Sequence, residues 1–508
     1  MREPLALTGL SLTIDDVVSV ARGGRPVRPD SEAIARVAAS RRVIDDAIAR
    51  GETIYGVNTG FGKLAHIRID PSRLADLQVN LIRSHAAGVG AALSADVVRA
   101  MMLLRANVLL RGTSGVRPEL PSLLIDLLNA EIHPRVPEQG SVGASGDLAP
   151  LSHLALALMG EGEVAAVGGG WRPAAHALRE AGLAPLTLAP KEGLAFVNGT
   201  QAQTGLAALL VRDAWTLWSA AHSAAAMSLE AVRGTPVPFD SRIHDARPHA
   251  AQQRSAGLMR ELLRGSEIRE SHREGDPRVQ DAYSLRCTPQ VLGAVGEAFG
   301  FVERLVATEL NAATDNPLVF DGDVLSGGNF HGQPVALALD VLAIALATLA
   351  GLAERRLERV VNPDLSSGLP PFLAREPGLE SGFMTAQITA AALAAETRVL
   401  ATPASVQSIP TEGNQEDFVP MGMTGGWKAR RVLDNAARVV AIELLAAADG
   451  LEFLKPLRPG RGVARAHALL RDAGFAALRG DRSLSADIER CATLVLEGRF
   501  GATTTEGG

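Results

Sequence analysis

The sequence predicts an all-α protein built as a bundle of long helices. Alanine and leucine dominate its 508 residues, and aromatic residues make up only 4%. This composition favours helices, because alanine and leucine have high helix propensity whereas strands are enriched in aromatic and β-branched residues. Several helical patterns also exceed the globular average of about 11 residues. Long alanine-rich helices joined by polar loops are typical of a helix bundle.

The expected helices can be followed along the chain. A short one begins near Leu148, directly after a glycine-rich turn. A long one begins near Thr200 and stops at Gly234, just before Pro236. A glycine followed closely by a proline is common at the C-terminal end of a helix. Four more long patterns cover residues 291–311, 335–360, 382–401 and 428–448.

Two parts are expected in the chain. Residues 1–199 form a mainly helical N-terminal domain that carries the turn at 144–146, and residues 200–508 form a long-helix bundle with loops. The hydrophobic content of 47% is ample for a large core. The apolar run 335–353 contains Asp340, and its uncharged part is shorter than the roughly 20 residues that a bilayer needs. It therefore predicts a helix buried on all sides, and no membrane partner.

Charge and cysteine content exclude several classes of protein. The net charge of −6 comes from interspersed charges, which argues against nucleic acid or an anionic membrane as the main partner. The two cysteines, Cys287 and Cys491, lie far apart, so neither a disulfide framework nor a zinc site is indicated. With no cleavable N-terminal segment, a cytoplasmic location is expected.

Familiar catalytic motifs are missing from the sequence. There is no phosphate-binding GxxxxGK[ST], no HExxH, and the glycines around Ser145 do not have the GxSxG spacing. Nucleotide binding is therefore poorly supported, and no metal site is expected.

Tyr55 and Tyr283 are the only tyrosines, and both lie in polar segments that suit a core aromatic poorly. Each could still cap the core with its hydroxyl outward. Alternatively, a phenol can act as a general base where nearby cations or donors stabilise the phenolate. Arg286 follows Tyr283 closely, and its planar guanidinium could instead clamp a substrate carboxylate.

Other polar residues stand beside apolar or small ones. Ser84 and His85 precede "AAGVG", where a histidine is more often structural than catalytic. Glu416 lies in the polar loop "NQED", and Phe330 lies in "SGGNFHG" at the start of an apolar helix. That second group can be a helix cap, a ligand site or both.

The stretch "GSVGASGDLAPLSH" allows two interpretations. It is either a glycine-rich turn before a helix or a turn bent so far that the Gly146 nitrogen reaches the Ala144 carbonyl. The stretch resembles the signature of the histidine and aromatic amino-acid ammonia-lyase family. Further segments resemble family segments in the same order, among them "YGVNTGFG", "SHAAGVG", "KEGLAFVNGTQA", "VQDAYSLRCTPQ", "SGGNFHG" and "NQED".

The resemblance implies a prosthetic group made from the chain itself. In this family the Ala-Ser-Gly triplet, here Ala144, Ser145 and Gly146, cyclises into a methylidene-imidazolone. Gly146 lacks a Cβ, so its nitrogen can approach the carbonyl in a conformation that other residues resist. Loss of the Ser145 hydroxyl then leaves an electrophilic methylene carbon, so no external cofactor is expected.

The resemblance also implies roles for the other residues. Tyr55 would remove a β-proton from the substrate, Asn198 and Phe330 would contact the ring, and Arg286 would bind the substrate carboxylate. Gln280 and Tyr283 would complete that loop, which a neighbouring subunit of a homotetramer would contribute.

Ser84-His85 and Glu416 point to L-histidine, whose imidazole they could bind, and hence to trans-urocanate as product, as in histidine catabolism. Phe418 and Gly332-Gln333 depart from histidine-lyase usage and leave room for an aromatic amino-acid lyase or a 2,3-aminomutase. A non-catalytic helical assembly protein is the remote alternative.

Overall fold

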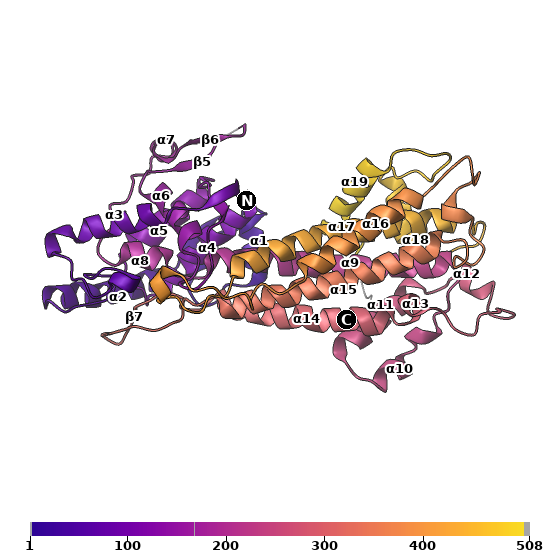
Figure 1. Ribbon diagram of the computed structural model, residues 1–508, viewed down its shortest axis with the longest axis horizontal. Coiled ribbons are helices and arrows are strands. Elements are labelled where there is room, and N and C mark those ends of the chain that lie inside the picture. The colour runs from indigo at the N-terminus through magenta and orange to yellow at the C-terminus, as the bar shows by residue number, and fades with distance from the viewer. Residues whose placement is uncertain (1–2, 167, 502–508) are drawn as a thin grey trace. The chain divides into compact units, whose positions relative to one another are not determined.

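The computed structural model describes residues 3–166 and 168–501, and they are mostly helical (Figure 1). The strands in these residues are three or four residues long and pair only two by two. The predicted all-α class is therefore confirmed. The long helices predicted from the alanine-rich patterns are present as α9 (Gln201–Ala231), α14 (Thr288–Glu309), α15 (Gln333–Val361), α16 (Met384–Leu400) and α17 (Gly422–Glu452).

The chain folds into two compact units. The first unit comprises Met1–Leu210, Val302–Asp340 and Pro403–Trp427, and the second comprises Val211–Phe301, Val341–Thr402 and Lys428–Gly508. Residues 302–340 and 403–427 lie beyond the expected boundary at residue 200, yet they group with the N-terminal residues. The physical reason is that long helices carry the chain out of the first unit and back into it.

The first unit holds short and medium helices around α4 (Ala95–Leu110), which is almost entirely buried. The other helices are α1 (Ile14–Ala21), α2 (Ser31–Ala49), α3 (Leu74–His85), α5 (Glu119–Asn129), α6 (Leu148–Leu158), α7 (Ala174–Glu180) and α8 (Glu192–Val197).

Small strand pairs lie between these helices. Strand β1 (Leu5–Leu7) pairs with β2 (Val27–Pro29) in parallel, with Leu5 opposite Val27. The other pairs are antiparallel: β3 (Val89–Ala92) with β4 (Pro137–Gln139), β5 (Glu163–Ala165) with β6 (Trp171–Pro173), and β7 (Leu318–Phe320) with β8 (Asp323–Leu325).

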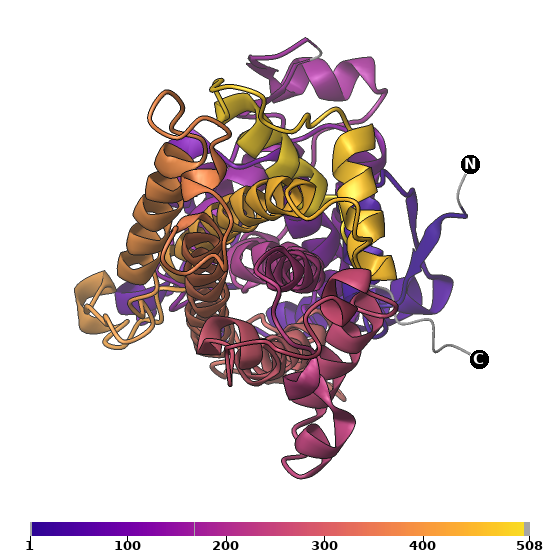
Figure 2. The same cartoon turned by 90° about the vertical axis from the view of Figure 1, so that its right-hand side faces the viewer.

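In the second unit, a buried ionic cluster joins three long helices, which are seen nearly end on in Figure 2. Glu443 of α17 accepts hydrogen bonds from Ser228 of α9 at 2.8 Å and from the Arg356 guanidinium of α15 at 2.5 and 2.8 Å. Burial raises the pKa of the Glu443 carboxyl, and the paired guanidinium opposes that shift. The shorter helices here are α10 (Ser241–Asp245), α11 (Ala250–Leu262), α12 (Glu267–Glu270), α13 (Tyr283–Arg286), α18 (Arg461–Asp472) and α19 (Ser485–Leu496).

Helix α15 contains the apolar run singled out in the sequence. By length and composition it could cross a membrane, but 61% of its most apolar stretch is buried within the protein. Asp340 accepts backbone hydrogen bonds from Ala404 at 2.9 Å and Ser405 at 2.7 Å, so its carboxylate is satisfied inside the first unit. The expectation of burial on all sides is wrong for a single chain, because Leu337 and Ile344 are exposed on one face.

Candidate active site

The turn that carries the Ala-Ser-Gly triplet has, at two points, a backbone conformation that residues with a side chain rarely adopt. Gly143 and Gly146 have φ values of +78° and +75°. A Cβ on Gly146 would lie 2.3 Å from the Gly199 carbonyl oxygen, which is far too close for any side chain. The Asp147 amide donates to that same oxygen at 2.7 Å. The turn is therefore held tightly against the segment that begins α9.

The Asp147 side chain holds the turn in place through hydrogen bonds. Its buried carboxylate accepts hydrogen bonds from Ser141 Oγ at 2.8 Å and from the Gln203 amide at 2.9 Å. Burial raises the pKa of Asp147 to about 6, and these hydrogen bonds oppose the shift. Since a buried carboxylate left without donors is costly, these contacts also fix where the turn lies.

Asn198 reaches the triplet directly. Its Nδ2 donates to the Ser145 carbonyl oxygen at 2.7 Å. Behind it, the fully buried Arg105 donates to the Asn198 carbonyl at 3.2 Å and to Gln201 Oε1 at 2.6 Å. Burial lowers the pKa of Arg105 to about 10. The sequence analysis did not single out Arg105, because its spacing carries no motif.

A cavity of about 560 Å³ opens in front of the triplet. Its lining brings together predicted site residues from distant parts of the first unit: Tyr55, His85, Ala144, Ser145, Asn198, Phe330 and Glu416. Gly146 is buried behind this lining. Ser84 lines an adjoining cavity together with His85.

Glu416 touches the triplet. Its Oε1 accepts from Ser145 Oγ at 2.6 Å, and its Oε2 accepts from Thr411 Oγ1 at 2.6 Å. These two contacts fix the carboxylate at the wall of the cavity. The bonded Ser145 hydroxyl is the group that would leave as water after the proposed cyclisation, so Glu416 faces the position where the methylene carbon would form.

His85 is held in place through its Nδ1 nitrogen. Its Nδ1 lies 2.9 Å from the Leu81 carbonyl oxygen, to which Ser84 Oγ also donates at 3.1 Å. Ser84 Oγ also lies 3.0 Å from the same Nδ1, so both of these contacts are made by one ring nitrogen. This places a hydrogen-bonding ring at the cavity wall.

The lining also contains several residues that the sequence analysis did not assign to the site: Phe61, His331, Glu412, Gln415, Asp417 and Phe418. Glu412 is the most consequential, because it adds a carboxylate close to Glu416. Partial desolvation by its surroundings raises the pKa of Glu412, and the Glu416 charge adds to the shift. The one available signal was its place two residues before "NQED", in "TEGNQED".

Tyr55 also lies in this acidic environment. The Gly62 amide donates to the Tyr55 hydroxyl at 3.1 Å. Burial raises the pKa of the Tyr55 phenol, the Gly62 hydrogen bond opposes that, and the charges of Glu412 and Glu416 raise it further. Among the described residues the cavity lining contains three carboxylates and no lysine or arginine, nor is any cluster arranged to hold a metal ion. Within this lining, the Gly62 hydrogen bond is the contact that favours the phenolate.

Gln280, Tyr283 and Arg286 belong to the second unit and are not part of this lining. The Arg286 guanidinium donates to Gln280 Oε1 and lies 5.7 Å from the centre of the Tyr283 ring. Tyr283 is 75% exposed. The three residues therefore form one polar and aromatic group that is open to solvent in a single chain.

The sequence matches the family described as "Aromatic amino acid lyase" over residues 12–472. It is 50% identical to a histidine ammonia-lyase of Koribacter versatilis and 52% identical to one of Sorangium cellulosum, covering 98% of this chain and 99% of each relative. The fold is similar to a tyrosine aminomutase from Streptomyces globisporus, with a TM-score of 0.93, 40% identity and 98% of both chains covered. It is also similar to a histidine ammonia-lyase from Trypanosoma cruzi, with a TM-score of 0.90, 44% identity and coverage of 98% and 94%. The chain therefore belongs to the aromatic amino acid lyase family.

Proposed function

We propose that this chain is a histidine ammonia-lyase, which eliminates ammonia from L-histidine and releases trans-urocanate. The observation that carries the proposal is the meeting of Ser145, Tyr55 and Glu416 in one acidic cavity. A carboxylate fixed at the cavity wall suits an imidazole N–H, whereas a phenyl ring would leave it unpaired. The two histidine ammonia-lyases named above, which are 50% and 52% identical to this chain, also support histidine as the substrate.

The residues present fit a methylidene-imidazolone formed from Ala144, Ser145 and Gly146. The absence of a Cβ at Gly146 allows the close approach that the turn requires, and Asn198 would hold the group through the Ser145 carbonyl. Once formed, such a group supplies an electrophilic carbon for the substrate amine. No external cofactor is needed in this proposal.

The remaining steps fall to the chain's own side chains. Tyr55, as phenolate, takes the substrate β-proton on its phenolate oxygen and becomes the neutral phenol. Glu416 and His85 orient the imidazole through hydrogen bonds, and Phe330 forms part of the apolar wall. Exclusion of water from this half-buried site strengthens each of these interactions.

A second copy of the chain completes the site in this proposal. The substrate carboxylate requires a cation, but the lining holds three carboxylates and, in the described residues, no lysine or arginine. Arg286, with Gln280 and Tyr283, would come from a neighbouring subunit of a homotetramer. The exposed apolar residues Ile388 and Val399 on α16 support burial of this helix between subunits. A cytoplasmic location remains part of the proposal.

A sibling activity is the second candidate. Phe418 lines the cavity and stacks loosely on His331, with ring centres 6.3 Å apart. An aromatic wall of this kind also suits a phenyl or phenol ring. The similarity in fold to a tyrosine aminomutase points in the same direction.

Incubation of the purified protein with L-histidine, L-tyrosine and L-phenylalanine separately tests the proposal. Products are followed by their conjugated absorbance and identified by mass spectrometry. Urocanate from histidine alone is the expected result. Cinnamate-type products, or a β-amino acid without net ammonia release, would assign the chain to a sibling activity.

Glu416→Gln is expected to lower the preference for histidine over phenylalanine. Replacing a charged acceptor by a neutral one weakens the hydrogen bond to imidazole, and a bond to a charged group contributes about 1.5–3 kcal/mol. We therefore expect the ratio of the two kcat/KM values to fall roughly 10- to 100-fold. Asp417→Asn makes the same charge change at the adjacent residue and should change the ratio less. An unaltered ratio in Glu416→Gln would place selectivity elsewhere.

Glu412→Gln is expected to shift the pH profile of kcat/KM. The Glu412 charge raises the pKa of Tyr55, so its removal lowers that pKa and leaves more phenolate at a given pH. The limb along which activity rises with pH should therefore move to lower pH. Asp417→Asn is the matched control, with a smaller shift expected. A profile that does not move, or moves to higher pH, would contradict Tyr55 as the base.

A further inference from the structure

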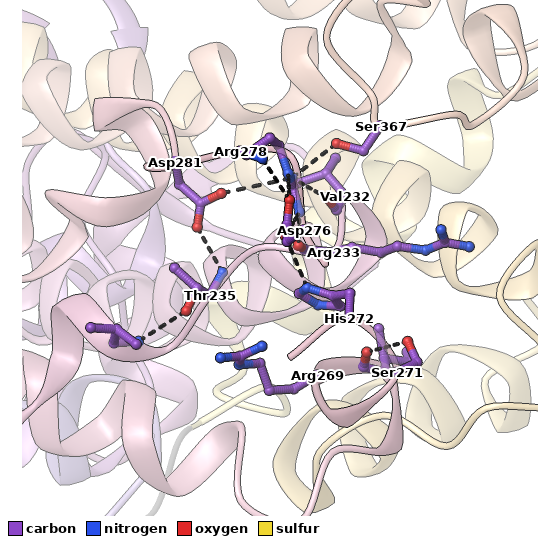
Figure 3. A network of polar contacts seen from close by, with 12 residues as sticks. Val232, Arg233, Thr235, Arg269, Ser271, His272, Asp276, Arg278, Asp281 and Ser367 are labelled. Atoms are coloured by element: carbon purple, nitrogen blue, oxygen red, sulfur yellow. Dashed lines mark hydrogen bonds and ion pairs between the residues drawn. The ribbon is translucent and has the colours of Figure 1, made fainter. Parts of the chain in front are cut away.

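The loop that precedes α13 is fastened by one arginine (Figure 3). Residues 271–282 contain no helix or strand, and the Arg278 side chain makes hydrogen bonds within this loop. Its Nε and Nη2 donate to the two oxygens of Asp276 at 3.1 and 2.9 Å. His272 Nδ1 lies 3.1 Å from the same carboxylate. A planar guanidinium paired with both oxygens of a carboxylate has a defined orientation.

The same guanidinium also binds the end of α9. Nη1 donates to the Val232 carbonyl at 2.9 Å and to Ser367 Oγ at 3.0 Å, and Nη2 donates to the Arg233 carbonyl. Carbonyls just past a helix C-terminus lack helical partners, and a cation there is favourable. All five donors of the arginine are thus used, which a lysine could not reproduce.

A second anchor lies on the other side of the exposed residues. The Thr235 amide donates to Asp281 Oδ2 at 2.7 Å, and the Asp281 side chain is only 4% exposed. Between the anchors, Val279 is 96% exposed and Gln280 is exposed as well. Arg278 and Asp281 therefore fix the backbone on either side of Val279 and Gln280. These two residues are exposed to solvent, and so is Tyr283, which follows Asp281.

We propose that Arg278 and Asp281 are positioning residues that hold the loop in the conformation in which Gln280, Tyr283 and Arg286 meet the substrate. The inference rests on the proposed function, in which these three side chains complete a neighbour's site. An irregular loop without such anchors samples many conformations, and a small misplacement of a binding group costs much of its effect. Asp276 acts through Arg278 by fixing its guanidinium.

The test compares Arg278→Gln, Arg278→Lys and Asp281→Asn with the wild-type full-length protein, using L-histidine as substrate. We expect kcat/KM to fall roughly 10- to 100-fold in Arg278→Gln. Arg278→Lys should recover little, because it keeps the charge but not the five-donor geometry. Arg273→Gln is the matched control, since Arg273 is an exposed arginine of the same segment whose ion pair, among the described residues, is with Glu270 at 3.2 Å. Its kcat/KM should stay within about twofold of wild type.

A double-mutant cycle separates positioning from general destabilisation. In the Arg286→Ala background, Arg278→Gln should lower kcat/KM by a smaller factor than in the wild type, because one of the three side chains that Arg278 positions, the one that binds the substrate carboxylate, is already gone. The inference would be overturned if the two substitutions lower kcat/KM by factors that simply multiply in the double variant. Normal kinetics in a folded Arg278→Gln protein would also overturn it. If Arg278→Gln does not fold, the same cycle with Asp281→Asn decides.

Two readouts keep this inference apart from the proposed function. Intact mass should show the loss of two water molecules in every variant, since the triplet lies in the first unit. A wild-type protein that releases ammonia from none of the three amino acids would refute the proposed function. An active wild type with an equally active Arg278→Gln variant would refute only the positioning role.

Discussion

Ser145→Ala is expected to lower the kcat of ammonia release by roughly four orders of magnitude or more. The substitution removes the hydroxyl that must leave as water, so no methylene carbon can form. The intact mass is the direct measurement. The wild type should be lighter than its sequence by two water molecules, and the variant should not show the full deficit.

Ser122→Ala is the matched control for this experiment. Its hydroxyl donates to the carbonyl of Pro118, the residue just before α5, at 2.8 Å. This variant should keep both the mass deficit and the activity. A Ser145→Ala protein that still releases ammonia would refute the electrophile. One that keeps its biological activity without releasing ammonia would support the non-catalytic assembly protein.

Tyr55→Phe is expected to lower kcat by roughly 10²- to 10⁴-fold, the usual contribution of a general base. It removes only the hydroxyl, so the triplet should still cyclise and the substrate should still bind. The Gly62 amide loses its acceptor, a modest change in a half-buried turn. The mass deficit, together with a KM close to that of the wild type, would show that kcat alone is affected. Near-normal turnover would refute the base assignment.

Local sequence signals were sufficient for the helices. Alanine-rich patterns predicted most ends of the long helices to within a few residues. The largest difference is at the start of α17, which begins at Gly422 and not at the expected residue 428. Helix formation depends on neighbours three or four positions apart, which a sequence displays directly. The turn at Gly143 and Gly146 was also readable, because glycine is favoured where φ is positive.

Motif resemblance selected the residues that share the cavity, but not all of its chemistry. Tyr55, Asn198, Phe330 and Glu416 lie in segments that resemble the family, and the fold gathers them around Ser145. Their roles stay predictions until the variants are measured. Resemblance said nothing of Glu412, although that carboxylate raises the pKa of Tyr55.

The fold class, the helices and the Ala-Ser-Gly turn could be predicted from the sequence, because each depends on short-range propensity or on a local motif. Three features became visible only in the folded chain: which segments make up each unit, how many carboxylates line the cavity, and the binding of Arg278 to the end of α9. Those features join residues far apart in the chain, as Ser145 and Glu416 show. Their contacts depend on how the helices pack, and packing leaves no local pattern in the sequence.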